Sequence, residues 1–216
     1  MTDAELARHV AAELAWDPRI DGARITVAVL GSRVTLRGTV GSFRQKREAG
    51  KAAGRVRGVV GVDDRLGVVI LAGDRRADAD LRDDVLQALL LDAHVPPSVG
   101  VSVRDGVVTL TGDADWQHQR DEAGFIAGNI LGVTRVDNRI RLTGRAKGNS
   151  DIAYAITRAF IRHATLDAGA LAVAQAGGAV ILTGTVRSWF EHDAAVAAAW
   201  AAPGVTTVDD HLTVTC

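Results

Sequence analysis

The chain has 216 residues, of which 47% are hydrophobic and 24% are charged, and its formal net charge is −1. This composition is typical of a soluble globular protein, and the charge excludes a generic polyanion-binding protein. The single cysteine, Cys216, excludes an internal disulfide framework and suits a reducing compartment.

The first predicted helix carries Glu5, Arg8, His9 and Glu13 and therefore lacks the apolar core of a signal peptide. No stretch approaches the roughly 18 consecutive apolar residues of a transmembrane helix. We therefore expect a cytoplasmic protein without a transmembrane span, or one that is peripheral to the inner membrane.

The chain repeats one unit three times, and each copy opens with a helical pattern. Apolar residues spaced by four place one stripe of each helix against a sheet. These residues are Leu6, Val10 and Leu14, then Leu81, Val85 and Leu89, then Ile152, Ile156 and Phe160.

A β-hairpin follows in each unit, because apolar residues then alternate with a period of two around turn signals such as Asp105-Gly106. The second strands, VTLRGTV, VTLTGDA and VILTGTV, superimpose. Each contains a glycine, and a glycine within a strand indicates close approach by another backbone. We expect a helix rich in small residues to make that approach at Gly38, Gly112 and Gly184.

A second helix and a third strand complete each unit. Ser42 with Gln45, and Ser188 with Glu191, predict capping boxes, and Asp115 is the expected cap in the middle unit. The resulting fold class is α+β, with three tandem α-β-β-α-β units. Each unit is a three-stranded mixed sheet with two helices on one face and a right-handed parallel crossover to its last strand. The predicted domains are residues 1–73, 74–147 and 148–216.

The unit resembles the BON domain, named after bacterial osmotically induced and nodulation-related proteins. The resemblance rests on VTLRGTV with VDDRL, VTLTGDA with VDNRI, and VILTGTV with VDDHL, and it covers nearly the whole chain. It implies a non-enzymatic module that binds phospholipid or attaches proteins to envelope structures, often in osmotic stress. Members are commonly exported, and in this respect the sequence departs from the family.

The repeated acidic doublet could be mistaken for a catalytic pair. Adjacent residues of a strand point to opposite faces, so Asp63 and Asp64 cannot converge on one substrate. The inward positions are Asp64, Asn138 and Asp210, and the asparagine shows that a negative charge is not required in the middle copy. We interpret these three residues as structural, accepting hydrogen bonds from backbone groups where the helix ends and the strand begins.

No other pattern predicts chemistry. The histidines are scattered, so we expect no metal site. No nucleophile elbow, phosphate-binding loop or dinucleotide fingerprint occurs. We therefore expect no catalytic residues and no cofactor.

Positive charge gathers in the first unit, which carries 12 Lys/Arg against 8 Asp/Glu, a balance of +4. Its second helix and the following turn contain the cations Arg44, Lys46, Arg47, Lys51, Arg55 and Arg57. The spacing places Arg44, Arg47, Lys51 and Arg55 on one stripe. The stripe is either an ordinary solvated face or a docking strip for anionic lipid head groups or an acidic partner. It has no interleaved aromatic residues, so nucleic acid is not the expected partner.

The second helix of the third unit is nearly uncharged and carries Trp189, Phe190 and Trp200, the last in the place of Gly54 and Gly128. Two roles remain open for these aromatic residues, and for Trp116 in the middle unit. They pack between repeats or between subunits of a homo-oligomer, or they form a wedge at a membrane surface.

The sequence therefore predicts a non-enzymatic adaptor that engages anionic phospholipid or another protein, in keeping with a role in osmotic or envelope stress. The alternative is a protein-interaction scaffold or holdase-like chaperone that binds no lipid.

Overall fold

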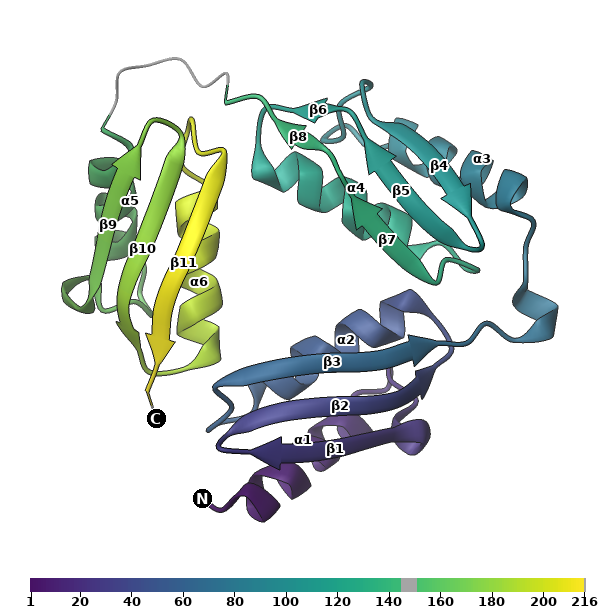
Figure 1. Cartoon of the computed structure of the whole chain (residues 1–216), viewed down its shortest axis with the longest axis horizontal. Coiled ribbons are helices and arrows are strands. Elements are labelled where there is room, and N and C mark those ends of the chain that lie inside the picture. The colour runs from purple at the N-terminus through teal and green to yellow at the C-terminus, as the bar shows by residue number, and fades with distance from the viewer. Residues whose placement is uncertain (145–150, 216) are drawn as a thin grey trace.

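The computed structural model describes residues 1–144 and 151–215 and contains the three predicted α-β-β-α-β units (Figure 1). The predicted boundary between residues 147 and 148 lies outside the described residues. Each unit has its own cluster of buried apolar side chains.

The first unit consists of α1 (Asp3–Trp16), a 3-10 turn η1 (Gly22–Arg24), β1 (Ile25–Leu30), β2 (Arg33–Val40), α2 (Phe43–Arg55) and β3 (Gly61–Val68). Strand β2 is central, antiparallel to β1 and parallel to β3. Leu6, Val10 and Leu14 of α1 pack with Val34 and Leu36 of β2, as the apolar spacing predicts.

The 3-10 turn η2 (Ala72–Asp74) leads into the second unit, which repeats the α-β-β-α-β order with α3 (Asp78–Leu90), β4 (Gly100–Arg104), β5 (Val107–Thr111), β6 (Asp113–Ala114), α4 (Gln117–Asn129), β7 (Arg135–Asn138) and β8 (Arg141–Leu142). Here the last two strands are interrupted. The sheet β4-β5-β7 is continued by a separate parallel pair, β6 with β8.

The third unit contains α5 (Ile152–Arg162), η3 (Ala168–Ala170), β9 (Leu171–Ala176), β10 (Ala179–Val186), α6 (Trp189–Trp200) and β11 (Thr207–Val214). Its sheet order is β11-β10-β9, which repeats the arrangement of the first unit. In Figure 1 the second helices α2, α4 and α6 lie toward the centre of the molecule.

The prediction that a helix approaches the repeated glycine is wrong. Gly38 pairs with Ile25 at the start of β1, and its φ is +123°. A Cβ at Gly38 would overlap the carbonyl oxygen of Arg24, which belongs to the chain entering β1. The equivalent glycines, Gly112 and Gly184, would overlap the carbonyl oxygens of Ser98 and Ala170 in the same way. The close approach is therefore made by the neighbouring strand, and it fixes where the hairpin begins.

The two serine caps form, but the predicted capping boxes are incomplete, because the Gln45 and Glu191 side chains accept from the backbone N–H groups of Gly41 and Arg187, each one residue before the cap. Ser42 Oγ accepts from the backbone N–H of Gln45 at 3.2 Å, and Ser188 Oγ accepts from that of Glu191 at 3.1 Å. The prediction that Asp115 caps α4 is wrong, because Trp116 occupies the N-cap position. Gln119 Oε1 accepts from the backbone N–H groups of Asp115 and Trp116, so one half of a capping box holds the helix start.

Candidate functional site

The inward member of each acidic doublet is held inside its own strand. Asp64 Oδ1 accepts from the N–H of Leu66 at 2.9 Å, and Asp210 Oδ1 accepts from that of Leu212 at 3.0 Å. Asn138 Oδ1 accepts from Ile140 in the same pattern, at 3.3 Å. The predicted position of these bonds, at the junction of helix and strand, is therefore wrong, because each side chain accepts from the backbone N–H two residues further along the chain, past the start of the strand.

The same inward positions also contact a basic residue of the second helix, eight residues after the repeated glycine. Lys46 Nζ lies 3.7 Å from Asp64 Oδ1, and it donates to the carbonyl oxygen of Leu66 at 2.6 Å. His192 Nε2 lies 2.7 Å from Asp210 Oδ2. In the middle unit Asn138 Nδ2 donates to the backbone oxygen of Arg120 at 2.6 Å. This contact joins the second helix to the third strand in every unit.

The outward members have separate partners. Asp63 pairs with Arg65 at 2.7 Å and Asp137 pairs with Arg139 at 2.6 Å, each two residues away on the same face. The bonds to Arg139 lower the pKa of the Asp137 carboxyl group. The two carboxylates of a doublet therefore contact different groups on opposite faces of the sheet.

Of the six cations on α2 and the turn after it, three have partners on other elements of the chain: Lys46, Arg47 and Arg55. Lys46 binds Asp64 as described, and Arg55 pairs with Glu13 at 3.1 Å and with buried Asp17 at 3.4 Å. Arg19 binds the same Asp17 through two nitrogens. The hydrogen bonds from Arg19 hold the pKa of Asp17 well below its usual range.

Arg47 is the third cation with an internal partner, and its partners belong to the next unit. Its Nη2 donates to Asn129 Oδ1 at 2.7 Å, and its guanidinium carbon lies 4.3 Å from the centroid of the Phe125 ring. Burial lowers the pKa of the Arg47 guanidinium, and its Nε is buried without a hydrogen-bond partner in the described part of the chain. The predicted stripe is therefore not one exposed face.

The other three cations extend toward solvent. Lys51 is exposed and lies 3.8 Å from Glu48 Oε1. Arg44 and Arg57 are exposed and make no hydrogen bond or ion pair with residues 1–144 or 151–215.

The second helices meet in three junctions, which follow the internal repeat. Phe43, Gln117 and Trp189 occupy equivalent positions, five residues after the repeated glycine, as do Gly54, Gly128 and Trp200, sixteen residues after it. In the α2–α4 junction, Phe43 lies on Gly128, where an added Cβ would be 2.8 Å from Phe43 Cδ1. In the α2–α6 junction, Trp189 lies on Gly54, with a corresponding distance of 3.0 Å.

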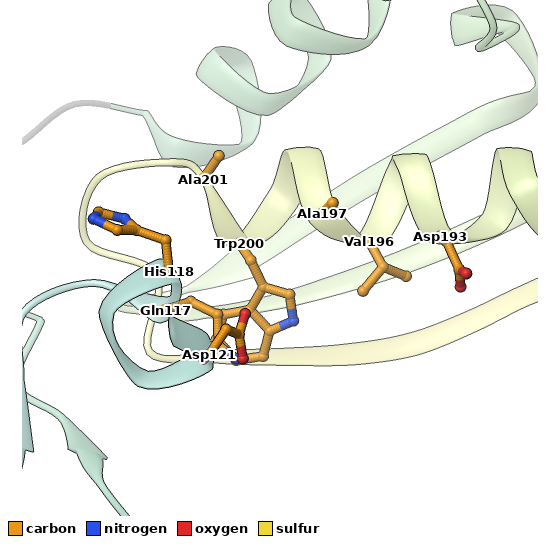
Figure 2. A pocket seen from close by; sticks show the side chains of 8 residues that line it. All are labelled: Gln117, His118, Asp121, Asp193, Val196, Ala197, Trp200 and Ala201. Carbon is orange, nitrogen blue, oxygen red and sulfur yellow. The ribbon is translucent and has the colours of Figure 1, made fainter. Parts of the chain in front are cut away.

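The α4–α6 junction reverses the sizes of the two residues. The short Gln117 replaces the aromatic ring, and Trp200 replaces the glycine. A groove of about 400 Å³ remains between the two helices (Figure 2). Its lining includes Gln117, His118 and Asp121 from α4, and Asp193, Val196 and Trp200 from α6.

The aromatic residues of the third unit thus have different environments. Trp189 lies in the α2–α6 junction and also stacks on His192, with a centroid distance of 4.3 Å. Trp200 lines the α4–α6 groove. Phe190 points outward and is 62% exposed. Trp189 and Trp200 therefore lie between repeats. From the sequence, packing between repeats and contact with a membrane were both open for these residues.

Within the described ranges, no group of three His, Cys, Asp or Glu side chains is arranged to hold a metal ion. No helix in the same ranges combines the length and the apolar character needed to cross a bilayer.

The chain is similar to one curated protein and to two solved structures. Osmotically-inducible protein Y of Escherichia coli (strain K12) is 35% identical over 150 residues, which cover 65% of this chain and 73% of that protein. A structure of CdsD, a structural protein of the type III secretion system of Chlamydia trachomatis, is 13% identical, covers 98% of this chain and 92% of its own, and has a TM-score of 0.27. Its C-terminal domain is 14% identical at full coverage of both chains, with a TM-score of 0.28. TM-scores this low support no conclusion about this chain.

The family comparison is stronger. The model of the BON domain matches residues 2–70, 77–144 and 148–216, which together make up nearly the whole chain. These three matches coincide with the three α-β-β-α-β units described above. The chain therefore belongs to the BON domain family.

Proposed function

We propose that this chain is a non-enzymatic adaptor of the BON type that binds anionic phospholipid surfaces in osmotic or envelope stress. The link to stress comes from the relative named osmotically-inducible protein Y. The link to lipid comes from the exposed cations of the first unit. The non-enzymatic role is supported by the doublet carboxylates, which contact separate partners on opposite faces.

The observation that carries the lipid proposal is the exposure of Arg44, Lys51 and Arg57 on α2 and its following turn. Each cation near an anionic membrane contributes about 1 kcal/mol. Three cations therefore supply roughly 3 kcal/mol, which corresponds to about a hundredfold in binding. That is enough for reversible, salt-sensitive binding and too little for stable anchoring.

The test is co-sedimentation with vesicles that contain phosphatidylserine, at low salt. Reversing Arg44, Lys51 and Arg57 to Glu should reduce binding about a hundredfold. A matched variant reverses three exposed arginines from other elements, Arg104, Arg135 and Arg158, so that its net charge changes by the same amount. Absence of binding by the unmodified chain, or equal losses in both variants, would refute a lipid site on α2.

The second candidate is a protein-interaction scaffold or holdase-like chaperone. It is favoured by the sheets, since the helices of each unit cover one face and leave the other open (Figure 1). Leu30 on edge strand β1 is 84% exposed. Exposed apolar strands accept extended segments of other chains. For this candidate, the chain should suppress aggregation of an unfolded client, and the triple reversal on α2 should leave that suppression unchanged.

A further inference from the structure

The groove of the α4–α6 junction is equivalent, through the internal repeat, to a space in the α2–α4 junction. In the α2–α4 junction the side chain of Arg47 fills that space. Asp121 is the equivalent of Arg47, because each lies nine residues after the repeated glycine. In the α2–α4 junction the Arg47 guanidinium stacks over Phe125 and donates to Asn129 Oδ1. The α4–α6 junction has no corresponding cation, because the residue equivalent to Arg47 is Asp121, a carboxylate.

The groove also contains one buried acceptor without a donor, the side-chain oxygen of Gln117. Gln117 Nε2 donates to Asp121 Oδ1 at 2.7 Å, and this bond fixes the orientation of the amide. Gln117 Oε1 is consequently left as an acceptor, and it is buried without a hydrogen-bond partner among the described residues. A buried acceptor of this kind destabilises the protein unless a donor reaches it. Partial desolvation raises the pKa of Asp121, although the residue keeps contact with solvent at the mouth of the groove.

The remaining wall supplies an aromatic surface. Trp200 is half-buried and lies beside Gln117 and Asp121 in the groove (Figure 2). Asp193 adds a second carboxylate from the facing helix, although its Oδ1 already lies 3.3 Å from His192 Nδ1. The groove thus offers an indole ring, a carboxylate and an amide oxygen, from Trp200, Asp121 and Gln117. A planar cation with several N–H donors suits all three, because it stacks on an indole and donates to carboxylate and amide oxygens in one plane.

We propose that the α4–α6 groove is a binding site for an arginine side chain of a protein partner. The guanidinium group stacks on Trp200 and donates to Asp121 and to Gln117 Oε1. These contacts differ from those of Arg47, because Ala197 and Ala201 stand at the positions of Phe125 and Asn129. The source is a polypeptide, because in the α2–α4 junction the guanidinium group is supplied by a side chain of the chain itself, Arg47 of α2. This site is separate from the lipid surface proposed for α2.

The test is an NMR titration of the full chain at about pH 7.5 with the capped tripeptide Ala-Arg-Ala, following the indole N–H of Trp200. We expect a saturable shift of this resonance, whereas the indoles of Trp116 and Trp189 report that the fold is unchanged. The matched peptide carries citrulline in place of arginine, which keeps the shape and removes the charge. Equal binding of both peptides, or no saturable shift, would overturn the proposal.

Variants locate the site. Asp121→Asn should weaken binding on the order of tenfold, because it removes a charged hydrogen-bond partner. The control is Asp209→Asn, an equal charge change on exposed β11 outside the groove, which should leave binding unchanged. If both variants bind alike, the groove is not the site. Agmatine, a free guanidinium compound, separates the two sources, since binding as tight as that of the tripeptide would assign the groove to a small molecule and refute a protein partner.

Discussion

Phe43, the first residue of α2, lies on Gly128 of α4, so closely that a Cβ on Gly128 would come 2.8 Å from Phe43 Cδ1. Trp189 and Gly54 form the equivalent large-on-small contact in the α2–α6 junction. In the α4–α6 junction the large residue is on the other side of the contact. The three junctions are thus equivalent in position and different in shape, so the repeats are not interchangeable within the chain.

Removing the ring of Phe43 should loosen the α2–α4 junction. Phe43→Ala is expected to cost about 2 kcal/mol, less than a fully buried phenylalanine because the ring is only half-buried. The measurement is hydrogen exchange at the α4 amides, which should accelerate. The control is Phe190→Ala, which removes an exposed ring from the start of α6 and should have little effect. Unchanged exchange in Phe43→Ala would contradict the junction.

The bond between Arg47 and Asn129 should couple the first and second units. In a double-mutant cycle with Arg47→Ala and Asn129→Ala, we expect a coupling energy of about 1–2 kcal/mol, because the bond joins a charged donor to a half-buried acceptor. Urea unfolding of the four proteins measures it. The same cycle with Lys51 in place of Arg47 should give no coupling, since Lys51 extends toward solvent. Additive losses for Arg47 and Asn129 would refute the contact.

Gly38 should not tolerate a side chain. Gly38→Ala places a methyl group onto the Arg24 carbonyl oxygen and forces alanine to adopt a φ of +123°. The expected loss is about 3 kcal/mol or more, because a steric overlap adds to an unfavourable backbone conformation. Gly31→Ala separates the two effects, since Gly31 also has a positive φ and has open space around its Cβ position. That variant should lose only about 1 kcal/mol in the same thermal unfolding experiment.

The stability of the third unit should depend on pH through His192. The hydrogen bond to Asp193 and the charge of Asp210 raise the pKa of His192, although burial opposes them. Since the folded pKa exceeds the unfolded value of about 6.5, the stabilisation is fully present below about pH 6.5 and is lost as pH rises through the folded pKa. Denaturant unfolding of the third unit, monitored by hydrogen exchange of the α6 amides, should therefore give a lower free energy of unfolding at about pH 9 than at about pH 6.

Two variants check the assignment to His192. Asp210→Asn should flatten the pH dependence, because it removes one of the two carboxylates that hold the proton. His192→Lys introduces the residue found at the equivalent position of the first unit, Lys46, and should hold its charge across this range. A pH slope that persists unchanged in both variants would mean that another group causes it.

The sequence alone determined the α-β-β-α-β unit and its repetition, because each unit buries its own apolar stripe within about 70 residues. The spacing of Leu6, Val10 and Leu14 is a local property, and the hydrophobic effect acts on it in the same way in every copy. The caps by Ser42 and Ser188 were predictable because each bond joins residues only three positions apart. The backbone that approaches Gly38 was not predictable, because a glycine in a strand indicates a close backbone without identifying the segment to which that backbone belongs.

Only the tertiary structure decided which residues of the second helices face another unit. Arg47 and Lys51 lie one helical turn apart on the same basic stripe, yet one stacks on Phe125 and the other is exposed. Their different environments depend on the docking of helices that are distant in sequence, and periodicity within one helix carries no information about that docking. The open groove beside Trp200 has the same origin. Its shape comes from a reversal of large and small residues between two helices, and this reversal becomes visible only when the helices are brought together.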